Sequence, residues 1–345
     1  MNIDKEFIRK RALEQIVANG HRVATHLAEE FGLSRQGANG YLQSMVREGL
    51  IDAEGTTRAR VYRIRPLTEV SQSYPSDGLQ EDLVWRGLIA PVVARFPENV
   101  RHLWNYAATE MINNAIDHSG APEVRVCVRE NALNTEVIVT DEGVGIFQKI
   151  QGALNLLDPR EAILELAKGK VTTAPETHTG EGIFFTSRAL DSFEIESHHL
   201  RFNHSQRGGN SISEQAGDTP GTRVRMSLAN DSARIMREVF EAFANPTFDK
   251  TVVPLRLAQY SGEKLISRSQ AKRVAFRFER FKRIELDFAG VSEVGQAFAD
   301  ELFRVFPSAH PTIRIVPVNT EPAVALMIRR VVAASSAGKK SKQHS

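Results

Sequence analysis

The stretch "ATEMINNAIDHS" (residues 108–119) places three polar side chains at regular spacing in an otherwise helix-forming segment. Glu110, Asn114 and His118 follow one another every four residues. Because an α-helix turns once in about 3.6 residues, side chains four apart lie on the same face, one above the other. Most of the other positions are apolar and are expected to be buried: Met111, Ile112, Ala115 and Ile116. The segment therefore predicts a helix that packs against a core and presents a carboxylate, an amide and an imidazole along one side.

The composition is that of an ordinary globular protein, and it argues against several classes. The chain has 345 residues, of which 41% are hydrophobic and 25% charged, which suits two or three domains. Its formal net charge of +2 is too small to imply a nucleic acid or a membrane as partner of the whole chain. Cys127 is the only cysteine, which excludes a disulfide within the chain. The sequence holds no apolar run of the kind found in signal peptides or membrane spans, so we expect a cytoplasmic protein with no membrane partner.

Three further motifs follow the opening helix in order. "EVRVCVRENALNTEVIVTDEGVGIF" (residues 123–147) alternates apolar and polar residues like two strands, and the second strand runs into Asp141, Gly143 and Gly145. "THTGEGIFF" (residues 177–185) places two glycines at the start of a helix, and "PGTRVRMSL" (residues 220–228) begins a strand at Gly221 and Thr222. Each motif alone is weak, whereas the four in this order form a specific pattern.

Together the motifs resemble the ATP-binding domain of the GHKL superfamily, which includes gyrase, the ninety-kilodalton heat-shock chaperone, the mismatch-repair ATPases and the histidine kinases. The nearest pattern is that of the anti-sigma-factor serine kinases, in which E-x-x-x-N-x-x-x-H also occurs. The resemblance implies a Bergerat-type α/β sandwich over residues 79–232 that binds ATP and Mg²⁺. Two other interpretations remain open: a helix whose polar face is only solvated, and a degenerate site that binds ATP without hydrolysing it.

The resemblance implies roles for the polar residues of the helix. Asn114 would coordinate Mg²⁺, a cation that prefers oxygen ligands and retains several waters. Glu110 would orient or deprotonate the attacking water or hydroxyl, and His118 would lie near the phosphates.

The resemblance also implies roles for the later motifs. Asp141 would accept a hydrogen bond from the adenine amino group, and Thr222 would support the same edge of the base. The glycines would let the backbone approach the ligand, at the base and at the phosphates respectively: Gly143 and Gly145, then Gly180 and Gly182.

Residues 146–179 connect the two glycine motifs and are interpreted as a lid over the triphosphate. Within them, "DPREAILELAKG" (residues 158–169) has Asp158 as helix cap, Pro159 in the first turn and Gly169 as stop. We expect this segment to be an amphipathic helix and ATP to order the lid.

Residues 1–66 resemble a winged helix-turn-helix module of bacterial regulators. Two helical patterns meet at Gly32, Ser34 is suited to cap the next helix, and an alternating segment around Gly55 predicts a β-hairpin wing. Residues 67–78, "LTEVSQSYPSDG", are polar and turn-rich and are interpreted as a linker.

In such a module the helix after the turn enters the major groove of DNA. Arg35, Gln36 and Asn39 would then contact base edges, and Arg58 and Arg60 of the wing would hold phosphate. The module carries 11 basic and 8 acidic residues, so we expect DNA binding to require a homodimer. A winged helix used only for protein contacts remains the alternative.

Residues 233–332 alternate strand and helix patterns, which predicts a small α/β domain with a largely parallel sheet. "IELDFAGV" (residues 284–291) followed by "AFADELFRVF" (residues 297–306) resembles the STAS domain of anti-sigma-factor antagonists. The antagonists carry a phosphorylated serine at the start of this helix, whereas this chain has Gly295, Gln296, Ala297 and Phe298 there. Residues 333–345 are interpreted as a disordered basic tail.

The sequence therefore predicts a multidomain α+β protein with a winged helix, a Bergerat-type domain and a STAS-like domain. The leading hypothesis is a regulator that binds DNA and Mg–ATP and contacts a protein partner through the STAS-like domain. The alternative is a serine/threonine kinase that phosphorylates a separate antagonist protein. The two hypotheses differ in whether a protein hydroxyl or only water receives the γ-phosphate.

Overall fold

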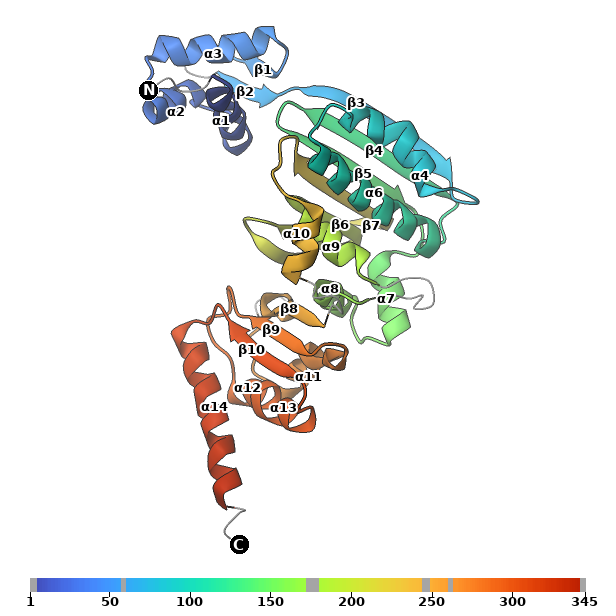
Figure 1. The fold of residues 1–345 in the computed structure, drawn as a ribbon, viewed down its shortest axis with the longest axis vertical. Helices are drawn as coiled ribbons and strands as arrows, with labels where there is room; N and C mark the ends of the chain where they lie inside the picture. Colours follow the sequence, from blue (N-terminus) through green and yellow to red (C-terminus); the bar gives the residue numbers. More distant parts are fainter. Residues whose placement is uncertain (1–4, 57–59, 172–179, 244–248, 260–262, 342–345) are drawn as a thin grey trace.

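The protein consists of three parts that follow one another along its long axis (Figure 1). The structure is a computed structural model and describes residues 5–56, 60–171, 180–243, 249–259 and 263–341. An N-terminal helical module lies at one end, a five-stranded sheet with its helices lies in the middle, and a C-terminal α/β domain with a long last helix lies at the other end. No helix of the described ranges has the length and apolar content that crossing a membrane would need.

The N-terminal module combines three helices with a two-stranded antiparallel hairpin. The helices are α1 (Lys5–Ala18), α2 (Val23–Phe31) and α3 (Arg35–Arg47), and the strands are β1 (Ile51–Glu54) and β2 (Val61–Ile64). Gly32 ends α2 in the left-handed conformation, at φ 64°. Ser34 caps α3, because its hydroxyl accepts a hydrogen bond of 3.0 Å from the backbone N–H of Gly37. Leu27, Leu42 and Met45 are buried in a core that belongs to this module alone.

The expected linker over residues 67–78 is wrong, because most of it is a strand. β3 (Pro66–Pro75) pairs antiparallel with β4 (Glu123–Asn131) along its whole length. The strand is at the edge of the sheet, and much of its surface faces solvent, which explains its polar composition.

The central sheet is antiparallel and has the strand order β3-β4-β5-β7-β6. Its remaining strands are β5 (Asn134–Asp141), β6 (Ser192–Ser205) and β7 (Gly209–Ala229). Helices cover one face, onto which the strands direct Val124, Val126, Val137 and Val139. These helices are α4 (Glu81–Val84), α5 (Ala90–Val93), α6 (Glu98–His118), α9 (Gly182–Ala189) and α10 (Met236–Phe243), with a π-helical turn η2 (Trp85–Ile89) between α4 and α5.

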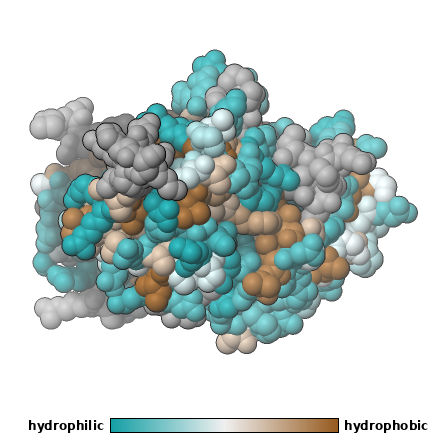
Figure 2. All heavy atoms as spheres, turned by 90° about the horizontal axis from the view of Figure 1, so that it is seen from below, coloured by the Kyte–Doolittle hydropathy of each residue, from teal (hydrophilic) through white to brown (hydrophobic). Residues whose placement is uncertain are grey.

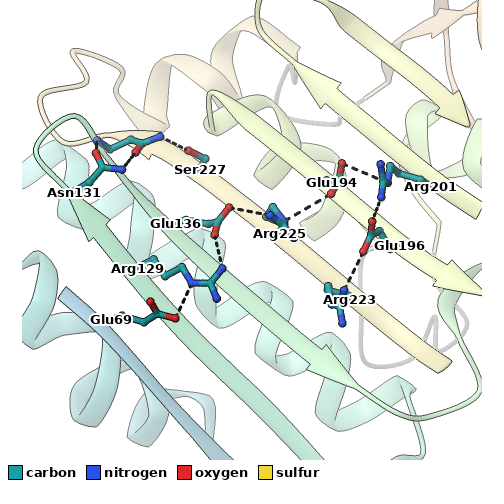
Figure 3. A network of polar contacts seen from close by, with 11 residues as sticks. Glu69, Arg129, Asn131, Glu136, Glu194, Glu196, Arg201, Arg223, Arg225 and Ser227 are labelled. Carbon is teal, nitrogen blue, oxygen red and sulfur yellow. Dashed lines mark hydrogen bonds and ion pairs between the residues drawn. The ribbon is translucent and has the colours of Figure 1, made fainter. Parts of the chain in front are cut away.

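The opposite face of the sheet carries a ladder of alternating acidic and basic side chains (Figure 3). The ladder crosses the strands through ion pairs of 3.0–3.7 Å, apart from the closer pair of Arg201 with Glu196. In order, its members are Glu69, Arg129, Glu136, Arg225, Glu194, Arg201, Glu196 and Arg223. Four carboxylates face four guanidinium groups, so this face of the sheet carries no excess charge from the ladder.

The segment between the two glycine motifs contains α7 (Ile146–Leu154) and α8 (Pro159–Lys168). The prediction for α8 is confirmed, since the Asp158 carboxylate accepts a hydrogen bond of 2.8 Å from the N–H of Arg160 and Gly169 ends the helix. The later part of the expected lid, residues 172–179, lies outside the described residues.

The C-terminal domain has a three-stranded parallel sheet of order β10-β9-β8, as the sequence predicts. The strands are β8 (Lys250–Pro254), β9 (Arg283–Asp287) and β10 (Arg314–Val318). The helical segments are η3 (Leu255–Ala258), α11 (Arg268–Ala275), η4 (Phe278–Arg280), α12 (Gln296–Asp300), η5 (Glu301–Val305), α13 (Phe306–Ala309) and α14 (Pro322–Ser341). Seen from this end of the molecule, apolar patches alternate with hydrophilic side chains (Figure 2).

Two expectations at the borders of this domain need correction. The sequence places the start of the C-terminal domain at residue 233, whereas helix α10 packs on the central domain. There Phe240 contacts the rings of Tyr106 and Phe185 at centroid distances of 5.5 and 4.7 Å. The expected disordered tail over residues 333–345 is wrong as far as Ser341, because α14 continues to that residue with no proline to stop it. Residues 342–345 lie outside the described residues.

Candidate functional site

A cavity of about 280 Å³ lies beside α6, between the central sheet and the segment that contains α7 and α8. Its wall combines residues from four segments that are far apart in the sequence. Eight of the residues singled out from the sequence line it: Glu110, Asn114, His118, Asp141, Gly145, Gly180, Gly182 and Thr222. The fold therefore brings together four motifs whose proximity the sequence could only suggest by their order.

The polar face of α6 forms one side of this cavity. The apolar face of the helix is buried against the sheet through Ala108, Met111, Ile112 and Ala115. The amide nitrogen of Asn114 lies 4.0 Å from the sulfur of Met111, and among the described residues nothing donates a hydrogen bond to its carbonyl oxygen. This oxygen is therefore available to a ligand.

The carboxylate of Glu110 lies directly against the start of α9. A Cβ atom placed on Gly182 would collide with a carboxylate oxygen of Glu110, so a larger residue there would require the Glu110 side chain to shift. One turn earlier on α6, burial raises the pKa of Tyr106, and the charges of Glu110 and Glu181 raise it further. Negative charge is thus concentrated at this end of the cavity.

Asp141 and Thr222 are paired neighbours on β5 and β7 at the other end. The Asp141 carboxylate accepts a hydrogen bond of 3.0 Å from the N–H of Gly143. Burial raises the pKa of Asp141, while hydrogen bonds from the backbones of Gly143 and Thr222 oppose that shift. The hydroxyl of Thr222 accepts a hydrogen bond of 3.0 Å from the N–H of Ile146 and so fixes the first turn of α7.

Gly143 is the one glycine of the four that does not line the cavity. It packs instead against the end of α6, where a Cβ atom would collide with the backbone carbonyl of Ser119. Gly145 begins α7 at φ 81°, and a Cβ there would meet the hydroxyl of Ser197 at 2.6 Å. Gly180 has φ 74° and lies against the backbone of Val171. Both residues need the freedom of glycine, in conformation and in space.

Sequence reasoning missed Lys149 and most of the apolar wall. Lys149 lines the cavity from α7, and its ammonium group donates a hydrogen bond of 2.5 Å to the backbone carbonyl of His118. The only signal in the sequence is its position four residues after Gly145, on the first turns of a helix. The apolar lining comes from Val139, Ile150, Leu166, Val171 and Ile183, among others.

The lining suits a nucleotide held with a magnesium ion. Ligand cavities are mostly apolar with a few convergent polar groups and occupy upward of about 300 Å³, close to the volume found here. Mg²⁺ in nucleotide sites is held by one or two protein oxygens together with phosphates and waters. The carbonyl oxygen of Asn114 is an oxygen donor of that kind, and it lines the cavity one helical turn from Glu110.

The expected DNA-contacting residues lie on the N-terminal module. Arg35, Gln36 and Asn39 are all exposed on α3, which lies at the opposite end of the molecule from α14 (Figure 1). Arg60 is half-buried just before β2, and among the described residues its Nε has no hydrogen-bond partner. Arg58 lies outside the described residues.

Gly295 lies in the segment that, by the resemblance, corresponds to the phosphorylated serine of anti-sigma-factor antagonists. It is the N-cap of α12, and its N–H donates a hydrogen bond of 2.8 Å to the carbonyl of Leu265. A Cβ atom at this position would lie 2.7 Å from the Cα of Ile266. Any side chain here, including serine, would therefore require the neighbouring backbone to move.

Comparison with known proteins concerns the C-terminal part alone. Residues 270–325 match the family model described as a STAS-like domain of unknown function (DUF4325). No curated protein matches the chain. The matched residues begin in α11, include β9 and β10 and reach into α14. The C-terminal part of the chain therefore carries a STAS-like domain.

Proposed function

We propose that this protein is a nucleotide-gated regulator, in which Mg–ATP binds the cavity beside α6 and changes how a DNA-binding winged helix and the STAS-like domain act. The observation that carries the proposal is the convergence of Glu110, Asn114, Asp141 and Thr222 on one cavity from separate segments. In this proposal the central domain is a Bergerat-type ATP-binding domain of the GHKL superfamily.

The polar groups of the cavity support placing the adenine at one end and the phosphates at the other. The Asp141 carboxylate would accept a hydrogen bond from the adenine amino group, and the apolar residues between the two ends of the cavity would cover the base and ribose. Asn114 would hold Mg²⁺, and Glu110 would orient or deprotonate an attacking water. The N-terminus of α9, preceded by Gly180, would receive the phosphates, since free N–H groups and the helix dipole favour anions there.

The N-terminal module supports DNA as the second ligand. On α3 the exposed residues include Arg35, Gln36 and Asn39, together with Gly37 and Gly40, where the backbone is open to close approach. A helix with this exposed face suits the major groove, and a homodimer would supply two such helices. Use of the module for protein contacts alone remains an outcome of the test.

The geometry favours a regulator over a kinase of a separate antagonist. The helix α8 of the proposed lid is already covered by the STAS-like domain of the same chain: it contacts β8, and Arg277 pairs with its Glu165 at 3.1 Å. A separate STAS protein would have to displace this domain to reach the same surface. The position of the antagonist serine is also occupied by Gly295.

The test is a calorimetric titration of the full chain with ATP and Mg²⁺. Asn114→Ala is expected to abolish Mg²⁺-dependent binding and leave the circular dichroism spectrum unchanged. The matched control is Asn113→Ala, the neighbouring asparagine of α6, which does not line the cavity and is expected to bind like the wild type. Equal affinity of the wild type and Asn114→Ala would remove the assignment.

A second experiment separates the regulator from the kinase. The protein is incubated with γ-labelled ATP and Mg²⁺, with and without lysate proteins. Label in a protein band would identify a kinase and its substrate. Free phosphate alone, or intact bound ATP, is the result expected of a nucleotide-gated regulator.

A further inference from the structure

The helix α8 is shared between the cavity and the STAS-like domain. Leu166 and Val171, at its end and just beyond it, line the cavity. All residues from Glu161 to Lys168 are buried, although three of them are charged. The helix contacts β8 and η3 on one side and α9 on the other, so it lies at the junction of the two domains (Figure 1).

A buried ion cluster of Glu165, Lys168 and Arg277 joins the two domains at this junction. The Glu165 carboxylate pairs with Lys168 of its own helix and, at 3.1 Å, with Arg277 of the STAS-like domain. The side chains of the three residues are 2%, 1% and 9% exposed. Lys168 also donates a hydrogen bond of 2.9 Å to the carbonyl of Phe276, and its ammonium group lies 5.3 Å from the ring centre of Phe278.

Further bonds hold the end of α8 to the same domain. The buried hydroxyl of Thr251 on β8 donates a hydrogen bond of 2.6 Å to the carbonyl of Lys168. The carbonyl of Lys170 accepts hydrogen bonds from Arg277 and, at 3.2 Å, from Arg280. Nearer the start of α8, the Glu161 carboxylate lies 3.7 Å from the guanidinium group of Arg273 on α11.

The held segment leads directly into the proposed phosphate-binding glycines. Val171 follows Lys170, and its N–H donates a hydrogen bond of 3.1 Å to the carbonyl of Gly180. Gly180 in turn precedes Gly182, against which Glu110 is packed. Only two residues, Gly169 and Lys170, thus separate Lys168 of the buried ion cluster from Val171, which is hydrogen-bonded to the glycine motif.

We propose that the STAS-like domain controls release of nucleotide from the cavity, because it holds α8 closed through the buried ion cluster. The proposal rests on the proposed nucleotide function. The STAS-like domain also contacts β7 of the central sheet through η3, so α8 can leave the cavity only by moving out from between the two domains. That movement would pull Glu165 away from Arg277 and leave a desolvated charge without its partner, which is unfavourable. The buried ion cluster therefore slows dissociation, and a partner that displaces the STAS-like domain from α8 would release the nucleotide.

The choice of variants follows from the geometry of the buried ion cluster. Glu165 is shared by two cations, so Glu165→Gln leaves both Lys168 and Arg277 without their carboxylate. Lys168→Met leaves Glu165 paired with Arg277 and should have the smaller effect. The matched control is Arg268→Met on α11, because Arg268 pairs with Asp300 and Glu301 at 3.6 and 3.3 Å within the STAS-like domain and not with α8.

The test measures dissociation of a fluorescent N-methylanthraniloyl ATP from the full chain, chased with excess ATP in a stopped-flow instrument. Glu165→Gln is expected to accelerate release by at least about tenfold, a difference of about 1.4 kcal/mol in the barrier. Lys168→Met is expected to accelerate it less, and Arg268→Met is expected to release at the wild-type rate.

The outcomes distinguish the two proposals. Absence of binding to the wild type would overturn the nucleotide function itself. Binding with equal release rates for the wild type and Glu165→Gln would overturn the control by the STAS-like domain and leave the nucleotide function intact. If Glu165→Gln fails to fold, Thr251→Val decides, since it removes one hydrogen bond to α8 and no charge: release accelerated about fivefold supports the proposal, and an unchanged rate overturns it.

Discussion

His204 makes the stability of the central domain depend on pH below neutrality. Its Nδ1 lies 2.9 Å from the side-chain oxygen of Asn210, so Nδ1 carries the proton and donates this hydrogen bond. Its Nε2 is buried, and no partner for it exists within the part of the chain that the structure describes. The pKa of His204 is lowered to about 4, chiefly by burial; the positive charges of Arg188 and Arg234 contribute to this shift, and the hydrogen bond with Asn210 opposes it.

Because folding lowers the pKa of His204, the folded protein loses stability as the pH falls. The folded protein holds His204 neutral, whereas the unfolded chain takes up a proton near its ordinary pKa of about 6.5. The stability is therefore fully present above that value and is lost as the pH falls toward the folded pKa of about 4. The difference of about 2.5 pKa units corresponds to about 3 kcal/mol in total, of which about 2 kcal/mol is lost by pH 5.

Tryptophan fluorescence during urea unfolding at pH 7 and pH 5 measures this loss in the right domain, because both tryptophans, Trp85 and Trp104, belong to the central domain. His204→Asn keeps a donor near the position of Nδ1 and removes the titration, so it should lose about 2 kcal/mol less than the wild type between the two pH values. His102→Asn, at a histidine whose side chain is 69% exposed, should behave like the wild type. Equal losses in the wild type and His204→Asn would refute the reasoning.

Three further expectations concern the other parts of the molecule. Glu110→Gln should bind Mg–ATP as tightly as the wild type but release no phosphate, because the group that would deprotonate water is gone; calorimetry and a phosphate assay check this, and undiminished hydrolysis would contradict it. In gel-shift titrations, Arg35→Ala should cost about 1–3 kcal/mol at a specific DNA site, while Arg60→Ala should weaken binding to all sequences and reduce its salt dependence. Gly295→Ser should lower the thermal midpoint by several degrees, since its Cβ meets Ile266; an unchanged melting curve would show that the loop adapts.

The elements with local signals were predictable from the sequence. Asp158, Pro159 and Gly169 mark the ends of α8, and Ser34 marks the start of α3; each acts within its own turn of helix. The order of the glycine motifs was also enough to collect the residues of the cavity, because each motif sits at the end of a regular element. Their roles in binding ATP and DNA stay predictions.

What depends on distant partners was not predictable. Residues 67–78 look like a linker because they are polar, but residues 66–75 form a strand because they pair with the edge of β4 and Arg129 pairs with Glu69 at 3.0 Å. Glu165 and Lys168 look like a solvated helix face, and they are buried because Arg277 supplies a counter-charge from more than one hundred residues away. The local periodicity of hydrophobic residues predicts neither the strand pairing of β3 nor the burial of Glu165 and Lys168.

The sharing of α8 limits how this chain can be divided or recombined. By sequence the proposed ATP-binding region ends before β8 and the STAS-like domain looks like a separable unit, yet α8 contacts both the central domain and the STAS-like domain and is buried between them. A fragment ending at residue 243 would expose Glu165 and Lys168 together with the apolar residues around them. Exchange of the STAS-like domain for another would require a replacement for Arg277 and Thr251 at the same contact. The physical unit therefore extends across the boundary that the two sequence patterns suggest.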